Sequence, residues 1–368
     1  MKDKIGQLFF IGLEGKTLGA HEADFIVKNN IAGVTLFGRN VESPKQIHQL
    51  CTDLQKLRHK SSLKAPLFIA IDMEGGRVAR LKAPFTVWPA VMNMSKLDST
   101  SLAFRFAQAM GQELRAVGVN LDFAPCIDVL TNEKNVLIGD RSLGSDPEHV
   151  AKMASAIVRG YIKAGIIPCA KHFPGHGNTV IDSHEDLPVE TANLERLREV
   201  ELHPFKKVFR ARLDLVMTAH IKFPNVDPEW PVTLSEIFMK KILRDEMKYR
   251  ELAISDDLDM KALASHFPKE LIPVRALQAG CDLLLYCNDF TSPPMALEAV
   301  RKALADKKLD AAALEASLAK VLALKKEVLA QPDPLPFEEA TKIIGHPDHL
   351  RLSKAIAEGQ VPADLMTT

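Results

Sequence analysis

Short apolar runs recur along the chain at intervals that leave room for helices between them. These runs, rich in β-branched and aromatic side chains, predict eight β-strands at residues 8–11, 33–37, 67–71, 119–123, 166–170, 215–219, 252–255 and 282–286. Segments with apolar positions at helical spacing lie between most of them, at residues 101–117, 147–164, 194–212, 234–247 and 274–279. Because strands that alternate with helices form parallel sheets, this order predicts an α/β fold, a (β/α)8 TIM-type barrel. An open, doubly wound sheet is the alternative that the same alternation allows.

The pattern changes after Ala330, where the sequence QPDPLP places prolines at every second position. Proline ends a helix and stiffens a linker. We therefore expect a single catalytic domain at residues 1–330, followed at residues 331–368 by a Pro-containing linker and a short C-terminal extension. Weak helical patterns lie at residues 338–344 and 349–358. Whether this extension packs on the barrel or joins two copies is left open, and so is the oligomeric state.

The composition is that of an ordinary globular enzyme, and the 47 basic residues balance 47 acidic ones. This balance disfavours nucleic acid and membrane surfaces as partners. The five cysteines form no Cys-x-x-Cys pair, which indicates free thiols in a reducing compartment. The apolar run at residues 8–13 meets Glu14 rather than a cleavage site, and no run approaches the roughly 18 apolar residues of a membrane span. We therefore expect a cytoplasmic protein.

Polar side chains follow or lie within five of the predicted strands. They are Asp72, Asp122, Lys171 with His172, His220, and Asp256 with Asp257. An aspartate after a strand is most often a helix cap. In a barrel, however, catalytic groups gather where strands end and loops lead into helices. Five such positions in register predict a site at that rim.

The segment KHFPGHGNTVIDSH, residues 171–184, brings three histidines, a lysine and an aspartate close together in the sequence. Its glycines and proline, placed directly after a predicted strand, are typical of a mobile loop with an open and a closed state. The spacing of Asp182 and His184 allows a carboxylate to orient an imidazole that transfers a proton near neutral pH. A solvated turn with incidental histidines is the alternative.

The same residue types are also metal ligands. His172, His176, His184, Asp72 and Asp256 could together bind Zn²⁺ in a metal-dependent barrel hydrolase. Histidines separated by proline and glycine lack the usual paired spacing of such ligands. We therefore expect neither a metal nor another cofactor.

Six motifs occur in the order IDMEGGRVARL, GDRSLGSDP, KHFPGHG, DSH, TAH and SDDLDM. In this respect residues 1–330 resemble glycoside hydrolase family 3, and more narrowly its single-domain β-N-acetylglucosaminidases of peptidoglycan recycling. The resemblance implies a retaining exo-β-N-acetylglucosaminidase without a cofactor. Its substrates would be N-acetylglucosaminyl-1,6-anhydro-N-acetylmuramic acid and the peptide-bearing forms of that disaccharide.

The resemblance also implies roles for individual residues. Asp256 matches the nucleophile, which attacks the anomeric carbon and forms a glycosyl-enzyme intermediate. The residues themselves do not separate it from its neighbour Asp257. His184 matches the general acid and base, with Asp182 hydrogen-bonded to it, where most glycosidases use a second carboxylate.

Further matches are to the ligands of the terminal sugar. They are Asp72, Arg80, Arg141, Lys171 and His172. Two-pronged contacts to vicinal hydroxyls suit an aspartate and an arginine. Other readings are that Arg80 is a surface residue and that Lys171 is a structural ion-pair partner of Asp122 or Asp128. For His220 and Asp122 we expect structural rather than catalytic roles.

Two more alternatives keep the barrel but change its activity. A sugar-binding sensor would have lost turnover, although Asp256, Asp182 and His184 are all present. A β-N-acetylglucosaminide phosphorylase would use phosphate as the acceptor, which a histidine acid/base permits because neutral imidazole does not repel an anion.

Overall fold

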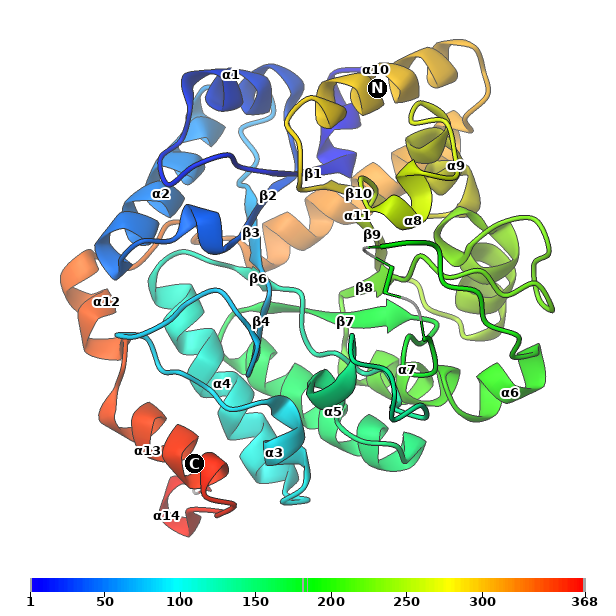
Figure 1. Ribbon diagram of the computed structural model, residues 1–368. Coiled ribbons are helices and arrows are strands. Elements are labelled where there is room, and N and C mark those ends of the chain that lie inside the picture. The colour runs from blue at the N-terminus through cyan, green and yellow to red at the C-terminus, as the bar shows by residue number, and fades with distance from the viewer. Residues whose placement is uncertain (1, 181, 184, 367–368) are drawn as a thin grey trace.

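Eight parallel strands close into a barrel in the computed structural model, which describes residues 2–180, 182–183 and 185–366 (Figure 1). The strands are β1 (Phe9–Gly12), β2 (Gly33–Leu36), β3 (Phe68–Ile71), β6 (Leu121–Asp122), β7 (Ile167–Phe173), β8 (Leu215–Thr218), β9 (Leu252–Asp257) and β10 (Leu283–Tyr286). They pair in the order β1-β10-β9-β8-β7-β6-β3-β2, and β2 closes on β1. The barrel prediction is confirmed, and each predicted strand overlaps an observed one, with ends that agree within two residues except that β7 extends three residues further, to Phe173.

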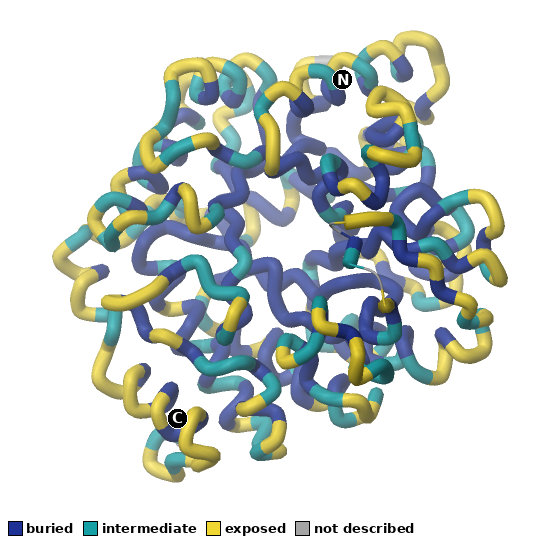
Figure 2. The backbone as a smooth tube through the Cα atoms, viewed as in Figure 1, coloured by how far each residue is buried: buried dark blue, intermediate teal, exposed yellow. Residues whose placement is uncertain are grey.

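The barrel interior is filled by side chains from alternate strand positions. Phe10 and Phe68 stack there with ring centroids 5.7 Å apart, and Phe123 packs beside them at 6.3 Å from Phe10. A second apolar layer lies between the strands and the surrounding helices. The buried centre and exposed periphery are visible in Figure 2. The barrel is therefore a packed core, and a ligand can enter only at its rim.

Helices surround the barrel. The larger ones are α1 (Ala20–Asn29), α2 (Pro44–Lys56), α4 (Thr100–Ala116), α5 (Pro147–Lys163), α7 (Leu202–Val208), the π-helix η7 (Ile237–Glu246), α9 (Leu271–Ala279), α10 (Ser292–Ala305) and α11 (Ala311–Val328). Several begin at side chains that accept a hydrogen bond from the first turn, including Ser43, Ser99 and Asp146. The caps and the apolar faces explain why the predicted positions of α4 and α5 are confirmed.

Three helix predictions differ from the structure. The helix expected at residues 274–279 is α9, which begins three residues earlier. The single helix expected at residues 194–212 is divided into α6 (Leu194–Glu199), α7 and the 3-10 turn η5 (Phe209–Ala211). Pro204 lacks the N–H that would bond to the carbonyl of Val200, so the helix breaks between these two residues. The segment expected at 234–247 begins three residues later and is wound as a π-helix.

A short hairpin at the rim was not predicted. Strand β4 (Met73–Gly75) pairs antiparallel with β5 (Val78–Ala79) directly after β3. Gly75 and Gly76 both have positive φ, at 94° and 57°, a conformation that favours glycine. The hairpin turns Glu74 inward, where it is buried.

The C-terminal extension packs on the outside of the barrel. Helices α12 (Phe337–Ile343), α13 (Pro347–Ala357) and α14 (Ala363–Met366) lie beside α4, as the orange and red ribbons of Figure 1 show. His349 contacts Glu113 of α4 at 2.8 Å, and Leu352 and Ile356 are buried against the barrel. The domain boundary at residue 330 stays a prediction. None of the described helices is both long and apolar enough to cross a lipid bilayer.

Candidate active site

A pocket of about 300 Å³ opens at the carboxyl ends of the barrel strands. Its walls include nine of the residues that the sequence singled out: Asp72, Arg80, Arg141, Lys171, His172, His176, Asp182, Asp256 and Asp257. They come from β7, β9, the residue that follows β3, and the loops that follow β5, β6 and β7. His184 lies outside the described residues. Of the five strand-end positions that the sequence placed at the rim, those of Asp72, Lys171 with His172, and Asp256 with Asp257 line this pocket, and the roles of these residues stay predictions.

An ion-pair network lines one part of this pocket. The Lys171 ammonium lies 2.7 Å from Asp72 Oδ1 and 2.7 Å from Glu74 Oε1. Arg141 donates two hydrogen bonds of 2.8 Å to the two carboxylate oxygens of Glu74. Lys171 therefore pairs with Asp72 and Glu74, and the alternative that it pairs with Asp122 or Asp128 is wrong.

Charge compensation keeps this buried network ionised. Burial would raise the pKa of Glu74, but Arg141 and Lys171 outweigh it and hold that pKa well below its ordinary value. Burial would likewise lower the pKa of Lys171, and Asp72 and Glu74 reverse the effect and raise it. Lys171 therefore stays protonated between Asp72 and Glu74 at the wall of the pocket.

Arg80 borders the pocket rather than the outer surface. Its guanidinium reaches Asp72 Oδ2 at 3.5 Å and lies over the ring of Phe37, 5.6 Å from the centroid. Its Nε is buried, with no hydrogen-bond partner in the described part of the chain.

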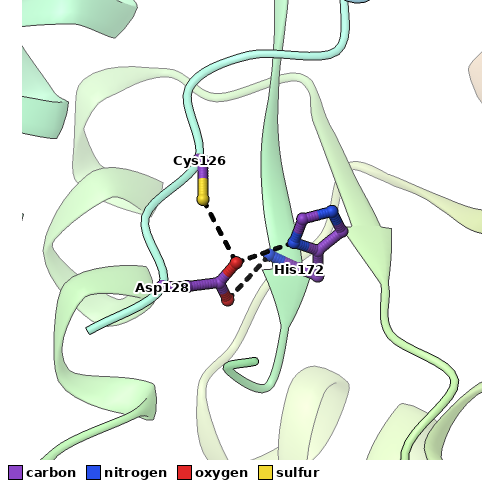
Figure 3. Close-up of side chains that lie close together, drawn as sticks. All are labelled: Cys126, Asp128 and His172. Atoms are coloured by element: carbon purple, nitrogen blue, oxygen red, sulfur yellow. Dashed lines mark hydrogen bonds and ion pairs between the residues drawn. The ribbon is translucent and has the colours of Figure 1, made fainter. Parts of the chain in front are cut away.

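Asp128 holds the end of β7 and the start of the loop that follows it (Figure 3). Its Oδ2 lies 2.7 Å from His172 Nδ1 and accepts from the Cys126 thiol at 3.2 Å. Its Oδ1 accepts the backbone N–H groups of His172 and His176, at 3.1 and 2.7 Å. Because Nδ1 of His172 faces a carboxylate, its Nε2 is left for the pocket.

The loop is held from within by His176. Its Nδ1 lies 2.6 Å from Thr179 Oγ1, and its Nε2 lies 3.3 Å from the Ser183 hydroxyl, next to Asp182. Burial, together with the charge of His172, lowers the pKa of His176 to about 4. A neutral His176 is therefore a structural member of the loop and a poor proton donor near neutral pH.

The two adjacent aspartates of β9 have different surroundings. The Asp257 side chain is buried, and its Oδ1 accepts the backbone N–H groups of Asp259 and Cys287 at 3.1 and 3.2 Å. Burial raises the pKa of Asp257 to about 7. Asp256 is less buried and accepts the N–H of Asp257 at 2.8 Å. Asp256 is the better placed carboxylate for nucleophilic attack, a distinction that the residues themselves did not make.

Two other rim candidates lie beneath the pocket. Asp122 is fully buried and accepts the Met73 N–H at 2.9 Å, and burial raises its pKa well above the ordinary value. His220 is also buried and lies 3.0 Å from the Asp257 carbonyl. Neither side chain lines the pocket.

Sequence reasoning missed Glu74 and the anchoring role of Asp128. Glu74 follows Asp72 by two residues in IDMEGG, and this spacing, so close to a flagged residue, was a usable signal. Asp128 was considered solely as a partner of Lys171. Its true partner, His172, is 44 positions away in the sequence, and no local pattern identifies that pair.

Of the ligands named for the metal-binding alternative, only His172 belongs to a cluster of metal-type donors among the described residues, and His184 lies outside them. Among the described residues, metal-type donors converge at Cys126, Asp128 and His172 and at Glu14, His21 and Glu22. Neither group contains Asp72, His176 or Asp256. In the first group, Asp128 is hydrogen-bonded to the Cys126 thiol and to His172 Nδ1.

Comparison with known proteins identifies the family. The model of the glycosyl hydrolase family 3 N-terminal domain matches residues 1–324. This chain belongs to glycoside hydrolase family 3. Its likeness to named members of the family follows from both sequence and structure.

A beta-hexosaminidase of Hydrogenovibrio crunogenus is 37% identical over 300 residues, which cover 78% of this chain and 82% of that protein. The family 3 β-N-acetylglucosaminidase of Paenibacillus sp. str. FPU-7 superimposes with a TM-score of 0.91 at 34% identity, over 98% of this chain and 68% of that one. NagZ of Neisseria gonorrhoeae does so with a TM-score of 0.78 at 28% identity, over 96% of this chain and 98% of that one. The family 3 chain described here is a glycoside hydrolase of the β-N-acetylhexosaminidase type.

Proposed function

We propose that this family 3 enzyme is a retaining exo-β-N-acetylglucosaminidase with Asp256 as nucleophile and the pair Asp182–His184 as general acid and base. The observation that carries the proposal is the difference between the two aspartates of β9. Both line the pocket, but Asp257 is engaged by two backbone N–H groups and has a pKa raised to about 7, whereas Asp256 is the less buried of the two.

The reaction then takes two steps. In the first, a carboxylate oxygen of Asp256 attacks the anomeric carbon, the glycosidic bond breaks, and the leaving oxygen takes a proton from His184. In the second, water attacks the same carbon, the bond to Asp256 breaks, and the water proton passes to His184. Asp182 would stabilise the imidazolium form of His184 in both steps. Two inversions give net retention of the β-configuration.

The sugar-binding residues support cleavage at a chain end. A pocket of about 300 Å³ corresponds to the smaller end of ligand sites and suits one monosaccharide. Asp72 and Lys171 offer an acceptor and a donor to adjacent hydroxyls, and Arg80, Arg141 and His172 complete the wall. We propose that the terminal N-acetylglucosamine occupies this pocket and that the remainder of the substrate extends out of its mouth.

The natural substrate is proposed to be a peptidoglycan fragment. N-acetylglucosamine attached to anhydro-N-acetylmuramic acid, with or without a peptide, is the substrate class that the resemblance implies, and the structural likeness to NagZ of Neisseria gonorrhoeae supports it. Free buried thiols at all five cysteines fit a reducing, cytoplasmic setting. Recycling of cell-wall fragments would take place there.

Hydrolysis of 4-nitrophenyl N-acetyl-β-D-glucosaminide by wild type, Asp256→Asn and Asp257→Asn tests the proposal. We expect a loss of kcat of at least about 1,000-fold in Asp256→Asn and a smaller loss in Asp257→Asn. Turnover by Asp256→Asn at the wild-type rate would overturn the nucleophile assignment. Analysis of products in phosphate and in a non-nucleophilic buffer adds a second test. Release of free N-acetylglucosamine in both buffers supports hydrolysis. Formation of a sugar 1-phosphate in the phosphate buffer would show that the enzyme is a phosphorylase instead.

A further inference from the structure

We propose that His220 is a positioning residue that holds the nucleophile-bearing end of β9 in place. The inference rests on the proposed role of Asp256 and concerns a residue outside the pocket wall. His220 follows strand β8, the neighbour of β9 in the barrel, and its side chain is buried. Its Nε2 lies 3.0 Å from the backbone carbonyl oxygen of Asp257, the residue directly after the nucleophile.

The hydrogen-bond partners fix the tautomer of His220. A carbonyl oxygen only accepts, so Nε2 carries the hydrogen and donates it to Asp257. Nδ1 lies 2.8 Å from Thr233 Oγ1, whose hydroxyl is also 3.1 Å from the Ala219 carbonyl and 2.9 Å from Thr218 Oγ1. Thr233 belongs to the 3-10 turn η6 (Val232–Leu234). The imidazole is thus anchored at one nitrogen and donates from the other.

The hydrogen bond from His220 affects Asp256 indirectly, by way of Asp257. The N–H of Asp257 donates to Asp256 Oδ1 at 2.8 Å, so the position of Asp257 helps to set the direction of the nucleophilic carboxylate. The same Asp257 carbonyl accepts a turn hydrogen bond from the Met260 N–H at 3.0 Å. His220 therefore forms its hydrogen bond to the turn at Asp257, the residue next to the proposed nucleophile Asp256.

The opposite side of this turn is tied to β10. Leu258 N–H donates to the Leu285 carbonyl at 2.9 Å, and Cys287 N–H donates to Asp257 Oδ1 at 3.2 Å. His220 supplies a tether from the β8 side. Hydrogen bonds on both sides therefore restrain the position of the end of β9 and of the Asp256 carboxylate that it carries. A displacement of about 1 Å in a reacting group can cost about 100-fold in rate, which gives this tether a catalytic consequence.

The placement predicts an effect on kcat rather than on sugar binding. Of the proposed sugar ligands, Asp72 directly follows β3, and Lys171 and His172 lie on β7. Their ion pairs do not include His220. Loss of the His220 donor should therefore leave KM nearly unchanged. The nucleophile would spend less time aligned with the anomeric carbon, so the rate of glycosyl-enzyme formation would fall.

Three variants test this role. His220→Met fills the space without a donor, His220→Gln restores an N–H close to the position of Nε2, and Thr233→Val removes the anchor of the ring at similar volume. kcat and KM are measured with 4-nitrophenyl N-acetyl-β-D-glucosaminide, and thermal melting checks that each variant is folded. We expect His220→Met to lose about 10- to 100-fold in kcat with KM within about threefold. His220→Gln should recover most of that loss, and Thr233→Val should fall between wild type and His220→Met.

Wild-type kcat in His220→Met would overturn the inference. The inference would also be overturned if His220→Gln lost as much kcat and as much melting temperature as His220→Met. In that case the N–H group of glutamine would not restore activity, as expected of a merely structural residue. If His220→Met does not fold, the kcat and KM of Thr233→Val decide, and an unchanged kcat counts against the tether. The outcome is separable from the proposed function, since turnover by Asp256→Asn would refute the nucleophile whatever the His220 variants do.

Discussion

Arg141 and Glu74 form a two-pronged ion pair in which the guanidinium donates one hydrogen bond of 2.8 Å to each carboxylate oxygen. The pair connects two loops, because Glu74 lies on the β4–β5 hairpin and Arg141 lies at the end of η4 (Gly139–Arg141). Lys171 joins the same carboxylate from β7. Glu74 thus fixes two of the proposed sugar ligands without needing to touch the sugar itself.

The first prediction concerns Glu74→Gln. An amide cannot balance two cations, so Arg141 and Lys171 would be left buried with one carboxylate fewer between them. We expect a loss of about 3 kcal/mol in unfolding free energy and a rise in KM of at least about tenfold. Denaturant unfolding and steady-state kinetics measure the two effects. Glu339→Gln, an exposed glutamate paired with Lys342, is the control, with changes within about 0.5 kcal/mol. Wild-type KM in Glu74→Gln would contradict the positioning role.

The second prediction concerns the tautomer of His172. In Asp128→Asn the amide NH₂ can face His172 Nδ1, which would then become the acceptor and move the ring hydrogen to Nε2. The nitrogen at the pocket would change from acceptor to donor. We expect kcat/KM to fall by about 10- to 100-fold, mostly through KM. Cys126→Val, which removes another side-chain contact of Asp128, should stay within about threefold of wild type. Equal kinetics in wild type and Asp128→Asn would show that this nitrogen does not contact substrate.

Asp128→Asn also has an expected pH signature. Burial would raise the pKa of Asp128, but His172 and the hydrogen bonds outweigh it, so the folded-state pKa lies below the ordinary value. A carboxylate with a depressed pKa contributes stability above its unfolded pKa of about 3.9, and that contribution is lost as pH falls toward the folded pKa. The stability difference between wild type and variant should therefore be largest near pH 7 and shrink in acid. A difference independent of pH between 3 and 7 would contradict this expectation.

The barrel could be predicted because each strand is a short apolar run bounded by polar residues. Helix interruptions could not, since a proline such as Pro204 is compatible with the first turn of a new helix as well as with a break. The hairpin that carries Glu74 was missed because its strands are two and three residues long, too short to show alternation.

The candidate site was partly visible for a similar reason. Residues at strand ends, such as Asp72 and Lys171, are brought together by barrel closure, which the strand pattern already implies. Contacts between loops, such as Arg141 with Glu74 or Asp128 with His172, depend on backbone paths that no periodicity encodes. The choice between Asp256 and Asp257 required the positions of two N–H groups, one of them 30 residues away at Cys287.

The third prediction separates the C-terminal extension from catalysis. Leu352 of α13 is 4% exposed, whereas Leu350 on the same helix is 50% exposed. Leu352→Ala should destabilise the protein by about 2–4 kcal/mol through lost burial and a residual cavity, and Leu350→Ala by less than about 0.5 kcal/mol. Both should keep kcat/KM within about twofold of wild type. A large loss of activity in folded Leu352→Ala would indicate that the extension supports the active site.

The fourth prediction concerns Lys325 of α11, which is 1% exposed at the end of the barrel opposite the pocket. Its ammonium donates to Gln7 Oε1 at 2.8 Å and to the Ala32 carbonyl at 2.7 Å, and it lies 4.9 Å from the centre of the Phe68 ring. No salt bridge joins it to a carboxylate among the described residues. Burial therefore lowers the pKa of Lys325 well below its ordinary value.

A lysine whose folded-state pKa is depressed binds its proton more tightly in the unfolded chain. Unfolding then takes up a proton at any pH between the two pKa values, so the wild type gains stability as pH rises toward about 10.4. Lys325→Met removes the cost of burying the amine and loses its two hydrogen bonds. We expect a net gain of about 1–3 kcal/mol near neutral pH that shrinks as pH rises toward 10, measured by denaturant unfolding. The exposed neighbour Lys326→Met should show neither effect. A variant that is less stable than wild type at neutral pH would mean that the bonds to Gln7 and Ala32 outweigh the burial of the amine.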